Sequence, residues 1–512
     1  MSTSIYPAYP PELNEEQNAY LLSNLKDWSI ANGLAVRPAP SFVPAEQDPA
    51  IALATTAPVT LFPSLFPKGC FEQAKGVAKA YNELYSAIAS DEGWLTGIVE
   101  ELVEIDDFMA GLWKVHLAVK REGYAQPLAL GLFRSDYMVH VDESNPSKTS
   151  VKQVEFNTIA SSFGGLSSQV AGLHQHLRAI DAYPEELSST INESSLPAST
   201  SVPSLAAGMA QAHQAYGPST TGLPTCVIFL VQDPERNVFD QRHLEYALNK
   251  NHGVRTFRLL FDKVLQETNV DDKRKLIYSP PHTPQKQYEV SLVYLRAGYG
   301  PGEYKDQSHW DARLQLERSA AIKCPTVLTQ LAGTKKVQQV LATPHSPHLA
   351  HFLPDKQEAA AVLETFAPIY PLDKSEAGNE ARKLATSPET AVRYVLKPQR
   401  EGGGNNIYRQ AIPDFLKGLP ESHWPAHILM EMIEPPAQSN TIFRNGELQS
   451  GGVICELGIY GACLWQTEAN GSRKMLENSE AGYLLRTKGD QSEEGGVAAG
   501  FGSVDSPCLV DI

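Results

Sequence analysis

The stretch from Thr225 to Phe261 constrains the fold more than any other part of the sequence. It reads TCVIFLVQDPERNVFDQRHLEYALNKNHGVRTFRLLF, where the apolar run CVIFLV is followed by a polar loop. The next segment predicts a helix that begins at Val238 and ends at Gly253, before a second strand, VRTFRL. This order predicts a β-α-β unit and therefore an α/β fold with a parallel sheet.

The loop before this helix carries polar groups to the helix N-terminus. Asn237 is placed to cap the helix, with Asp240 three residues on. Free N–H groups at such a terminus favour a bound carboxylate. The glycine pattern of dinucleotide-binding turns is missing here, which argues against an NAD-binding fold.

The length of 512 residues predicts two or three domains or lobes. Two Ser/Pro-rich stretches interrupt the periodic segments. We expect residues 182–203 to form a linker or a surface crossing, and residues 343–357 to form the entrance to another lobe. The apolar runs are too short for a membrane span, and the N-terminus does not read as a secretory signal, so we expect a cytoplasmic protein without a membrane partner.

Charge and cysteine usage narrow the possible partners. The formal net charge is −16, and an acidic surface repels a phosphate backbone, so no nucleic-acid partner is expected. The six cysteines show no CxxC and no Cys/His ligand spacing, which favours buried reduced thiols over disulfides or zinc. A small anionic substrate would have to be bound by local cations.

The segment VLKPQREGGGNNIY, residues 395–408, places three adjacent glycines after a short strand. Each glycine loses about 1 kcal/mol more backbone entropy on ordering than alanine does, which indicates a function for the backbone itself. Main-chain N–H groups can wrap nucleotide phosphates at Gly402, Gly403 and Gly404. Lys397 would add charge and Glu401 could hold magnesium. A flexible hairpin is the alternative.

A second candidate site lies in KQVEFNT, residues 152–158, which alternates like a strand. The alternation predicts Gln153, Glu155 and Asn157 on one face, where Glu155 and Asn157 could give two oxygens to one metal ion. A solvated edge-strand face is the alternative. The small residues that follow, ASSFGGLSS, suit close approach of a ligand.

Other basic residues stand where an anion could bind. In LAGTKKVQQVL, Thr334 is the expected N-cap, and Lys335 and Lys336 oppose the helix dipole unless a phosphate is bound. Arg134 and Arg296 each end an apolar run, as substrate-binding arginines often do. An exposed lysine pair and ordinary surface ion pairs are the alternatives.

The segment LLRTKGDQSEEGGVAAG places Arg486 and Lys488 before a Gly/Ala loop. A loop of this kind can close over a small ligand and exclude water. A mobile tail is the alternative.

In this order, these segments resemble the eukaryotic glutathione synthetases of the ATP-grasp ligase superfamily. The resemblance covers nearly the whole chain and rests on the motifs TLFPSLFP, RSDYM, VEFNT, SSFGGL, ERNVFDQR, QLAGTKKVQQ, LKPQREGGGNN, ILMEMIEP, ELGIYG, LLRTK and GGVAAG. It implies a permuted ATP-grasp fold. The parallel-sheet β-α-β substrate domain would span 222–333, between two parts of the nucleotide-binding body at 1–221 and 334–512, with a glycine-rich lid near 366–455.

The resemblance also implies roles for individual residues. The Mg²⁺ ligands would be Glu155, Asn157 and Glu401. Residues implied in ATP binding are Lys335, Lys397, Gly402, Gly403, Gly404, Asn406, Tyr408, Met430, Glu431, Ile433, Glu456, Lys488 and Glu494. Residues implied in substrate binding are Arg134, Ser162, Glu235, Arg236, Asn237, Gln241, Arg296, Tyr299, Arg486, Val497 and Ala498. Catalytic roles fall to Arg134, Lys335, Lys397 and Arg486.

The implied reaction is ATP-dependent ligation of γ-glutamylcysteine to glycine through an acyl phosphate, carried out by a homodimer. Two positions depart from the family pattern, since Ala160 and Ala297 stand where the family commonly has serine and aspartate. The alternatives are an ATP-grasp ligase that uses another amine, such as β-alanine, and a non-catalytic nucleotide-binding regulator.

Replacement of Glu401 by glutamine keeps the side-chain shape and removes a negative charge from the implied Mg²⁺ site. We expect ligation to fall at least ~100-fold, because a bound metal supplies several kcal/mol of charge stabilisation. Steady-state kinetics at saturating Mg²⁺ measures this change, and near-normal turnover would contradict the assignment.

Overall fold

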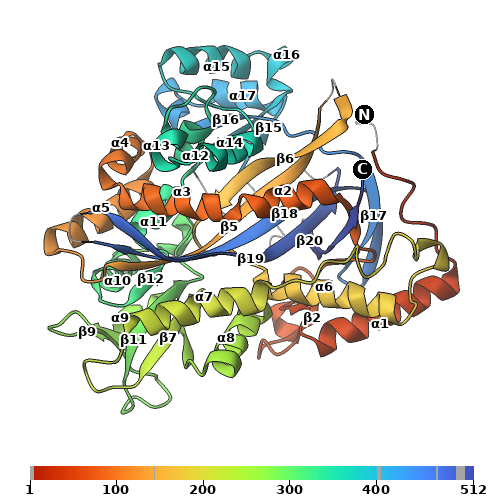
Figure 1. Cartoon of the computed structure of the whole chain (residues 1–512). Helices are drawn as coiled ribbons and strands as arrows, with labels where there is room; N and C mark the ends of the chain where they lie inside the picture. The colour runs from red at the N-terminus through yellow and green to blue at the C-terminus, as the bar shows by residue number, and fades with distance from the viewer. Residues whose placement is uncertain (1–4, 143–144, 400–404, 469–470, 492–501) are drawn as a thin grey trace.

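The computed structural model describes residues 5–142, 145–399, 405–468, 471–491 and 502–512. A mixed sheet of 13 strands runs through the middle of the molecule, with helices on both of its faces (Figure 1). Its main path is β17-β3-β20-β19-β18-β5-β12-β11-β10-β9; β6 pairs with β5, and β7 pairs with β11 and β8.

The strands of this sheet are β3 (Val59–Thr60), β5 (Leu128–Asp142), β6 (Asn145–Asn157), β7 (Thr225–Val231), β8 (Thr256–Leu260), β9 (Thr268–Val270), β10 (Leu276–Tyr278), β11 (Tyr288–Leu295), β12 (Ile322–Cys324), β17 (Gln438–Arg444), β18 (Glu447–Thr467), β19 (Arg473–Gly489) and β20 (Gly502–Asp505). Two small sheets pair β1 (Ala35–Val36) with β2 (Thr55–Thr56), and β4 (Ser64–Pro67) with β21 (Pro507–Val510).

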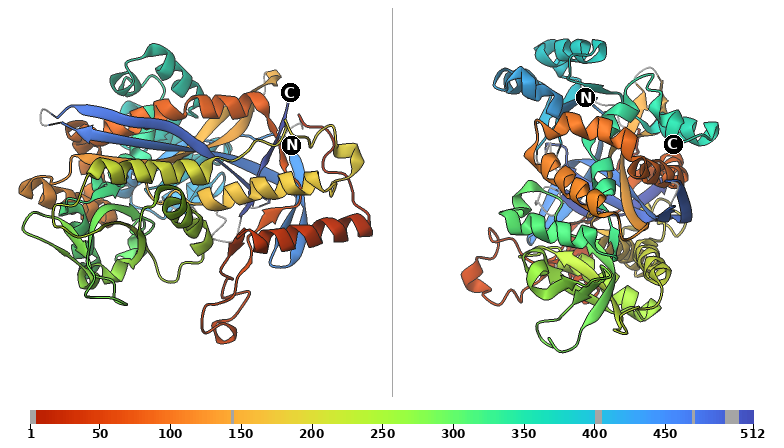
Figure 2. Two further views of the ribbon diagram at one scale, coloured as in Figure 1. Left: turned by 60° about the horizontal axis from the view of Figure 1, so that its bottom comes forward. Right: turned by 90° about the vertical axis from the view of Figure 1, so that its left-hand side faces the viewer.

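The helices cover the sheet from two sides, with α2, α3 and α5 on one and α6 and α7 on the other (Figures 1 and 2). Their bounds are α1 (Glu15–Ala31), α2 (Lys68–Gly76), α3 (Ala78–Ser90), α4 (Glu92–Val103), α5 (Asp107–Glu122), α6 (Gly164–Ala179), α7 (Ser201–Tyr216), α8 (Val238–His252), α9 (Val264–Glu267), α10 (Gln307–Arg318), α11 (Val327–Ala332), α12 (Lys335–Ala342), α13 (His348–Phe352) and α14 (Lys356–Thr365).

The predicted β-α-β unit is confirmed. Strands β7 and β8 are parallel, with α8 between them. The helix ends at Gly253, whose φ of 67° is a left-handed conformation that glycine adopts without a Cβ clash. The parallel strands are continuous with the antiparallel ones through the β12–β5 pairing, so both kinds belong to one mixed sheet.

A separate sheet of four strands lies at the top of Figure 1, with the order β13-β16-β14-β15. Its strands are β13 (Ile369–Pro371), β14 (Tyr394–Pro398), β15 (Ile407–Tyr408) and β16 (His427–Glu431), and its helices are α15 (Glu376–Thr386), α16 (Pro388–Ala391) and α17 (Ala411–Lys417). It has its own apolar cluster, which includes Leu372, Leu396, Ile412 and Leu429.

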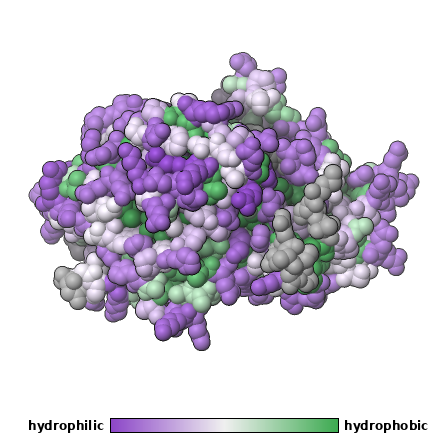
Figure 3. All heavy atoms as spheres, turned by 90° about the horizontal axis from the view of Figure 1, so that it is seen from above, coloured by the Kyte–Doolittle hydropathy of each residue, from purple (hydrophilic) through white to green (hydrophobic). Residues whose placement is uncertain are grey.

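The stretch 182–203 is a crossing that packs on the core, not a free linker, since its Leu187, Ile191 and Leu196 are buried. All six cysteines are buried and free, as predicted. Among the described residues, none of the helices combines the length and the hydropathy that a membrane span requires. The face in Figure 3 is mostly hydrophilic, with hydrophobic residues scattered over it.

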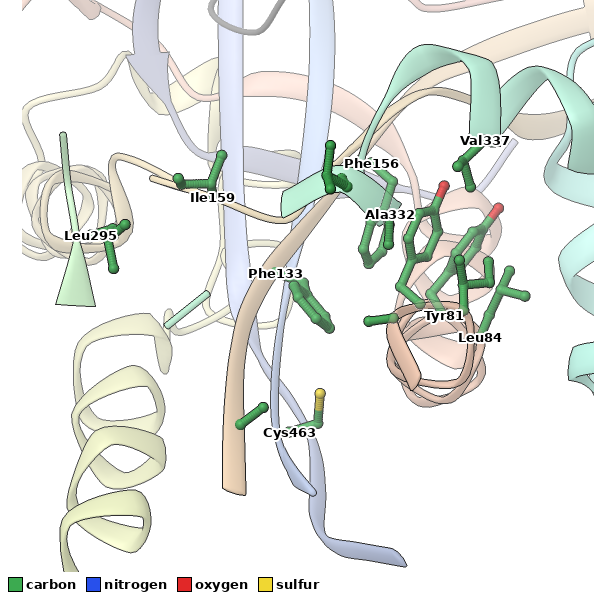
Figure 4. Packing of buried hydrophobic residues seen from close by; sticks show 14 of the residues in the cluster. Tyr81, Leu84, Phe133, Phe156, Ile159, Leu295, Ala332, Val337 and Cys463 are labelled. Carbon is green, nitrogen blue, oxygen red and sulfur yellow. The ribbon is translucent and has the colours of Figure 1, made fainter. Parts of the chain in front are cut away.

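Aromatic packing fixes which way strand β6 faces. Phe156 stacks on Tyr85 of α3 with ring centroids 3.7 Å apart. It also stacks on Tyr81 at 5.6 Å, as Figure 4 shows. Since alternate residues of a strand point to opposite faces, the buried Phe156 turns its neighbours Glu155 and Asn157 to the other face of β6.

The prediction that Gln153 shares this face is wrong. The register of β6 against β5 shifts by one residue, because Glu155 pairs with Asp136 whereas Gln153 pairs with Tyr137. This β-bulge leaves Val154 as the extra residue and reverses the alternation. Gln153 therefore points the opposite way, where its Nε2 donates to Ser135 Oγ (2.8 Å).

A buried carboxylate joins the two ends of the chain. Asp505 of β20 accepts hydrogen bonds from Thr60 Oγ1 (2.6 Å), Ser64 Oγ (2.5 Å) and Thr487 Oγ1 (2.6 Å), and from the main-chain N–H groups of Ser64 and Ser506. Burial raises the pKa of Asp505 from 3.8 to about 6, against the lowering effect of these donors.

Asp505→Ala leaves five buried donors without their acceptor, so the free energy of unfolding should fall by at least ~3 kcal/mol. The folded-state pKa lies above the unfolded one, so ionisation of Asp505 costs stability. The unfolding free energy of the wild type, relative to Asp505→Asn, should therefore decrease as the pH rises from about 4 to about 6. Urea unfolding across this range measures it; an increase would contradict the raised pKa.

Candidate active site

Strands β5, β6, β18 and β19 bring polar and charged side chains together on the face of β6 opposite Phe156. The carboxylate of Asp136, on β5, is fully buried. It accepts from Arg134 Nε (2.6 Å) and Nη2 (2.8 Å), from Asn157 Nδ2 (3.0 Å) and from Arg486 Nη2 (2.9 Å). Arg486 also pairs with Glu456 of β18. Three of the residues predicted from the sequence thus share one acceptor that the sequence analysis missed.

Charge and burial act against each other in this cluster. Burial lowers the pKa of Arg134 and Asp136 raises it, with a net rise. Burial also raises the pKa of Glu456 more than Arg486 lowers it. The pKa of Arg486 is also raised, by Glu456 and Asp136 against the effect of burial, so the charged form of both arginines is favoured.

Two buried lysines reach the same face from other elements. Lys335 Nζ, on α12, lies 2.6 Å from Glu155 Oε2, and Lys397 Nζ, on β14, donates to the carbonyl of Val154 (3.0 Å). Burial raises the pKa of Glu155, but the charges of Lys335 and Lys397 lower it by more, so the net shift is downward. Burial and Lys335 lower the pKa of Lys397 to about 8.

Both lysines of α12 are buried, so the alternative interpretation of Lys335 and Lys336 as an exposed surface pair is wrong. Lys336 is buried and faces Glu101 (3.4 Å) and Asp373 (3.7 Å). It is a structural tie between α4, α12 and the segment after β13, whereas Lys335 faces the site. Thr334 stands at the N-cap position of α12, but its side chain makes no capping hydrogen bond.

The oxygen donors of β6 fit a magnesium ion. Glu155 and Asn157 lie on one face, and Asn157 donates its Nδ2 to Asp136, so its Oδ1 is the amide atom left for a cation. The buried hydroxyls of Thr158 and Thr334, which flank Asn157 and Lys335 in sequence, have no hydrogen-bond partner within the described part of the chain. Among the described residues, there is no group of three or more Asp, Glu, His or Cys side chains that could by itself hold a metal ion.

The loop after β6 holds two arginines together. Arg296 donates Nη1 to Ser161 O (2.8 Å) and Nη2 to Ser162 Oγ (2.6 Å). Arg134 Nη1 donates to Ser162 O (3.2 Å), which also accepts from the hydroxyl of Tyr460 (2.6 Å). The two predicted substrate arginines thus both contact Ser162, Arg296 at its hydroxyl and Arg134 at its carbonyl.

The predicted Asn237 cap is wrong in its detail. Asn237 occupies the N-cap position of α8 without a capping hydrogen bond, and its Nδ2 donates to Asp240 Oδ2 (3.2 Å). Asp240 instead accepts from the main-chain N–H groups of Phe163, Gly165 and Leu166. It caps α6 from another element and lies 3.8 Å from Arg296, a role that spacing along the sequence could not show.

Other predicted substrate residues surround this loop. Glu235 accepts from Asn237 N (2.8 Å) and Gln241 Nε2 (2.7 Å). Three of these predicted substrate residues each have a buried polar atom with no partner among the described residues, namely Asn237 Oδ1, Gln241 Oε1 and Arg296 Nε. An unpaired buried polar atom costs about 1–3 kcal/mol, which a polar ligand would offset.

Two further predicted substrate residues are held by main-chain contacts. Tyr299 N donates to Glu303, which also accepts from two neighbouring N–H groups. Arg236 lies to the side, where its Nε donates to Arg37 O (3.4 Å).

Most of the remaining residues implied in ATP binding lie on or next to the four-stranded sheet. Val395 of β14 pairs with Tyr408 on one side and Met430 on the other. Asn406 donates to the Tyr408 hydroxyl (3.1 Å), and Glu431 accepts from the hydroxyl of Tyr370 (3.0 Å). Ile433 is buried just beyond β16, and Lys488 lies on β19 opposite Ile454.

Seven predicted residues lie outside the described ranges: Glu401, Gly402, Gly403, Gly404, Glu494, Val497 and Ala498. Of the two departures from the family pattern, Ala160 has a φ of 51°, a left-handed conformation that is unusual for alanine, and Ala297 is fully buried.

Comparison with known proteins identifies the family of this chain. The sequence model described as "Eukaryotic glutathione synthase, ATP binding domain" matches residues 15–509. The chain belongs to the eukaryotic glutathione synthase family. It is 39% identical to the glutathione synthetase large chain of Schizosaccharomyces pombe, over 89% of this chain and 91% of that one. It is 38% identical to the Homo sapiens glutathione synthetase, over 96% and 97%.

A solved structure shares the fold of this glutathione synthase family member. The glutathione synthetase-like effector GSS30 from Globodera pallida, in its apo form, superposes with a TM-score of 0.74 at 21% identity, and covers 99% of this chain and 100% of that one. At this identity the likeness supports the mixed α/β fold and nothing about activity.

The lowered pKa of Lys397 predicts a pH dependence of ATP binding. Above about pH 8 the free protein loses this charge, and bound phosphates would restore it, so ATP binding should take up a proton near pH 8.5. Lys397→Arg, which stays charged, should abolish the uptake. Calorimetric titration in two buffers of different ionisation enthalpy measures it.

Lys336→Arg is the matched control, because Lys336 is equally buried but faces carboxylates outside the site. It should retain the proton uptake of the wild type. Equal uptake by Lys397→Arg would show that the proton goes to another group.

Proposed function

We propose that the chain catalyses the ATP-dependent ligation of γ-glutamylcysteine and glycine to glutathione, with ADP and phosphate as the other products. The observation that carries the proposal is the convergence of Lys335, Lys397 and Arg486, from three elements distant in sequence, beside Asn157. Lys335 pairs with Glu155, Arg486 pairs with Asp136 and Glu456, and Lys397 donates to the carbonyl of Val154. Such an array of fixed charges suits the transfer of a phosphoryl group.

The reaction runs in two steps. An oxygen of the cysteinyl carboxylate attacks the γ-phosphorus of ATP, a new P–O bond forms, and the bond to the ADP oxygen breaks. The free amine of glycine then attacks the acyl carbon, a C–N bond forms, and phosphate leaves as the nitrogen loses a proton to solvent. No nucleophilic side chain is required.

The protein's residues position the substrates and balance their charge. Lys335 and Lys397 face the transferred phosphate, and Arg134 and Arg296 orient carboxylates of the dipeptide. Orientation of this kind is worth effective molarities of ~10⁵ M or more. Mg²⁺, which Glu155, Asn157 and Glu401 would hold, supplies charge neutralisation at the phosphates when bound.

The domain organisation follows from the same proposal. The chain has a permuted ATP-grasp fold, with the substrate domain at 222–333 inserted between the two parts of the body. The four-stranded sheet is the core of a lid over ATP, and Gly402, Gly403 and Gly404 belong to its phosphate loop. We further propose a cytoplasmic homodimer. The contact between Lys397 and Val154 O supports a nucleotide at the joint of lid and body.

A ligase that uses another amine and a non-catalytic nucleotide-binding regulator are the two competing functions. ADP release should require γ-glutamylcysteine and glycine together. β-Alanine should support a kcat/KM roughly 10- to 200-fold lower, since one methylene is worth ~1–3 kcal/mol. A coupled ADP assay across acceptors distinguishes all three functions. Equal use of β-alanine would favour the other ligase, and no acceptor-dependent release would favour the regulator.

A further inference from the structure

The buried carboxylate of Asp136 contacts an implied Mg²⁺ ligand, Asn157, and two implied substrate-binding residues, Arg134 and Arg486. Its Oδ2 accepts from Arg134, Asn157 and Arg486, which lie on β5, β6 and β19. We propose that Asp136 is a positioning residue that sets the amide of Asn157 for a divalent cation and holds the two arginines toward the substrate. This inference rests on the proposed function.

The orientation of the Asn157 amide depends on what its nitrogen can donate to. Nδ2 donates to Asp136 Oδ2 (3.0 Å) and to the carbonyl of Arg134 (3.3 Å). Both of these partners are acceptors, so the amide group must turn its nitrogen toward them. Its oxygen, Oδ1, then points to the other side. A divalent cation needs this oxygen, since an amide N–H₂ group cannot ligate it. Asp136 thus acts on the cation through its neighbour, without direct contact.

The same carboxylate sets two guanidinium groups. Arg134 makes a two-point contact with Asp136 through Nε and Nη2, which leaves Nη1 to reach Ser162 O (3.2 Å). A bidentate pair of this kind fixes the plane of the guanidinium as well as its distance. Arg486 Nη2 is shared between Asp136 and Glu456, so its position depends on both.

The facing strand leaves room for this arrangement. Gly458 of β18 pairs with Asp136 across the sheet. A Cβ at this position would lie 2.7 Å from Arg134 Cδ and 2.7 Å from Asp136 Oδ1, closer than real Cβ contacts. A glycine is therefore needed for the Arg134–Asp136 pair to keep its geometry. By contrast, a Cβ on Gly451 of the same strand would meet no heavy atom of the described residues within 4 Å.

Asp136→Asn tests the inference, because an amide in place of the carboxylate brings an N–H₂ group against donors whichever way it turns. The probe is Mn²⁺ with a non-hydrolysable ATP analogue, and bound Mn²⁺ is measured by electron paramagnetic resonance, without turnover. We expect Mn²⁺ to bind ~10–100-fold more weakly, as for other residues that orient metal ligands. The KM for γ-glutamylcysteine should rise as well.

Glu245→Gln is the matched control. Glu245 is also buried and also accepts from two arginines, Arg242 and Arg258, at 2.6 Å each. The control should lose stability like Asp136→Asn but bind Mn²⁺ like the wild type. An equal loss of Mn²⁺ affinity in both variants would overturn the inference, because it would show a general effect of damage to a buried ion pair.

Gly458→Ala changes no charge, and it tests the positioning role of Asp136 if the Asp136→Asn variant does not fold. The added Cβ should displace the Arg134–Asp136 pair and weaken Mn²⁺ binding at least ~5-fold relative to Gly451→Ala. Wild-type Mn²⁺ affinity in a folded Asp136→Asn or Gly458→Ala variant would overturn the inference. Failure of the proposed function is a separate result, since the wild type itself would then release no ADP with both substrates.

Discussion

The pairing of β5 with β6 places the central polar groups of the site. It sets Asp136 opposite Glu155 and Arg134 opposite Asn157. The register is held from the other face by Phe156, whose ring stacks on Tyr85. Because a slip by one residue would exchange the two faces, aromatic packing in the core is what keeps the carboxylate and the amide on the site side.

The bulge at Val154 connects this strand pair to the four-stranded sheet. An extra residue in a bulge is left out of the ladder, and the carbonyl of Val154 accepts instead from Lys397 Nζ (3.0 Å). The irregularity thus supplies an acceptor for a buried lysine that comes from the second sheet. Lys336 strengthens the same joint through Asp373.

Local patterns predicted much of the fold and part of the site. The β-α-β unit could be read from one continuous stretch, because strand, helix and Gly253 all act over a few residues. Glu155 and Asn157 could be placed on one face for the same reason. Gln153 could not, since nothing in KQVEFNT signals the bulge that depends on the partner strand.

Other features depend on residues far apart in sequence. Lys335 and Lys336 are adjacent and identical in type, and only the fold shows that one faces Glu155 and the other Glu101 and Asp373. The roles of Asp136 and Asp240 could not be predicted because each serves partners on other elements. Asp136 accepts from Asn157 and Arg486 as well as from its neighbour Arg134, and Asp240 caps a helix that begins 76 residues earlier, not its own helix.

A crystal structure with Mg²⁺, ADP and γ-glutamylcysteine would show whether strand β6 holds the cation. We expect one Mg²⁺ coordinated by Glu155 and by Asn157 Oδ1 at ~2.1 Å, with Asn157 Nδ2 still on Asp136 and the dipeptide beside Arg134 and Arg296. A cation bound away from β6, or an Asn157 amide turned with its nitrogen toward the cation, would contradict it.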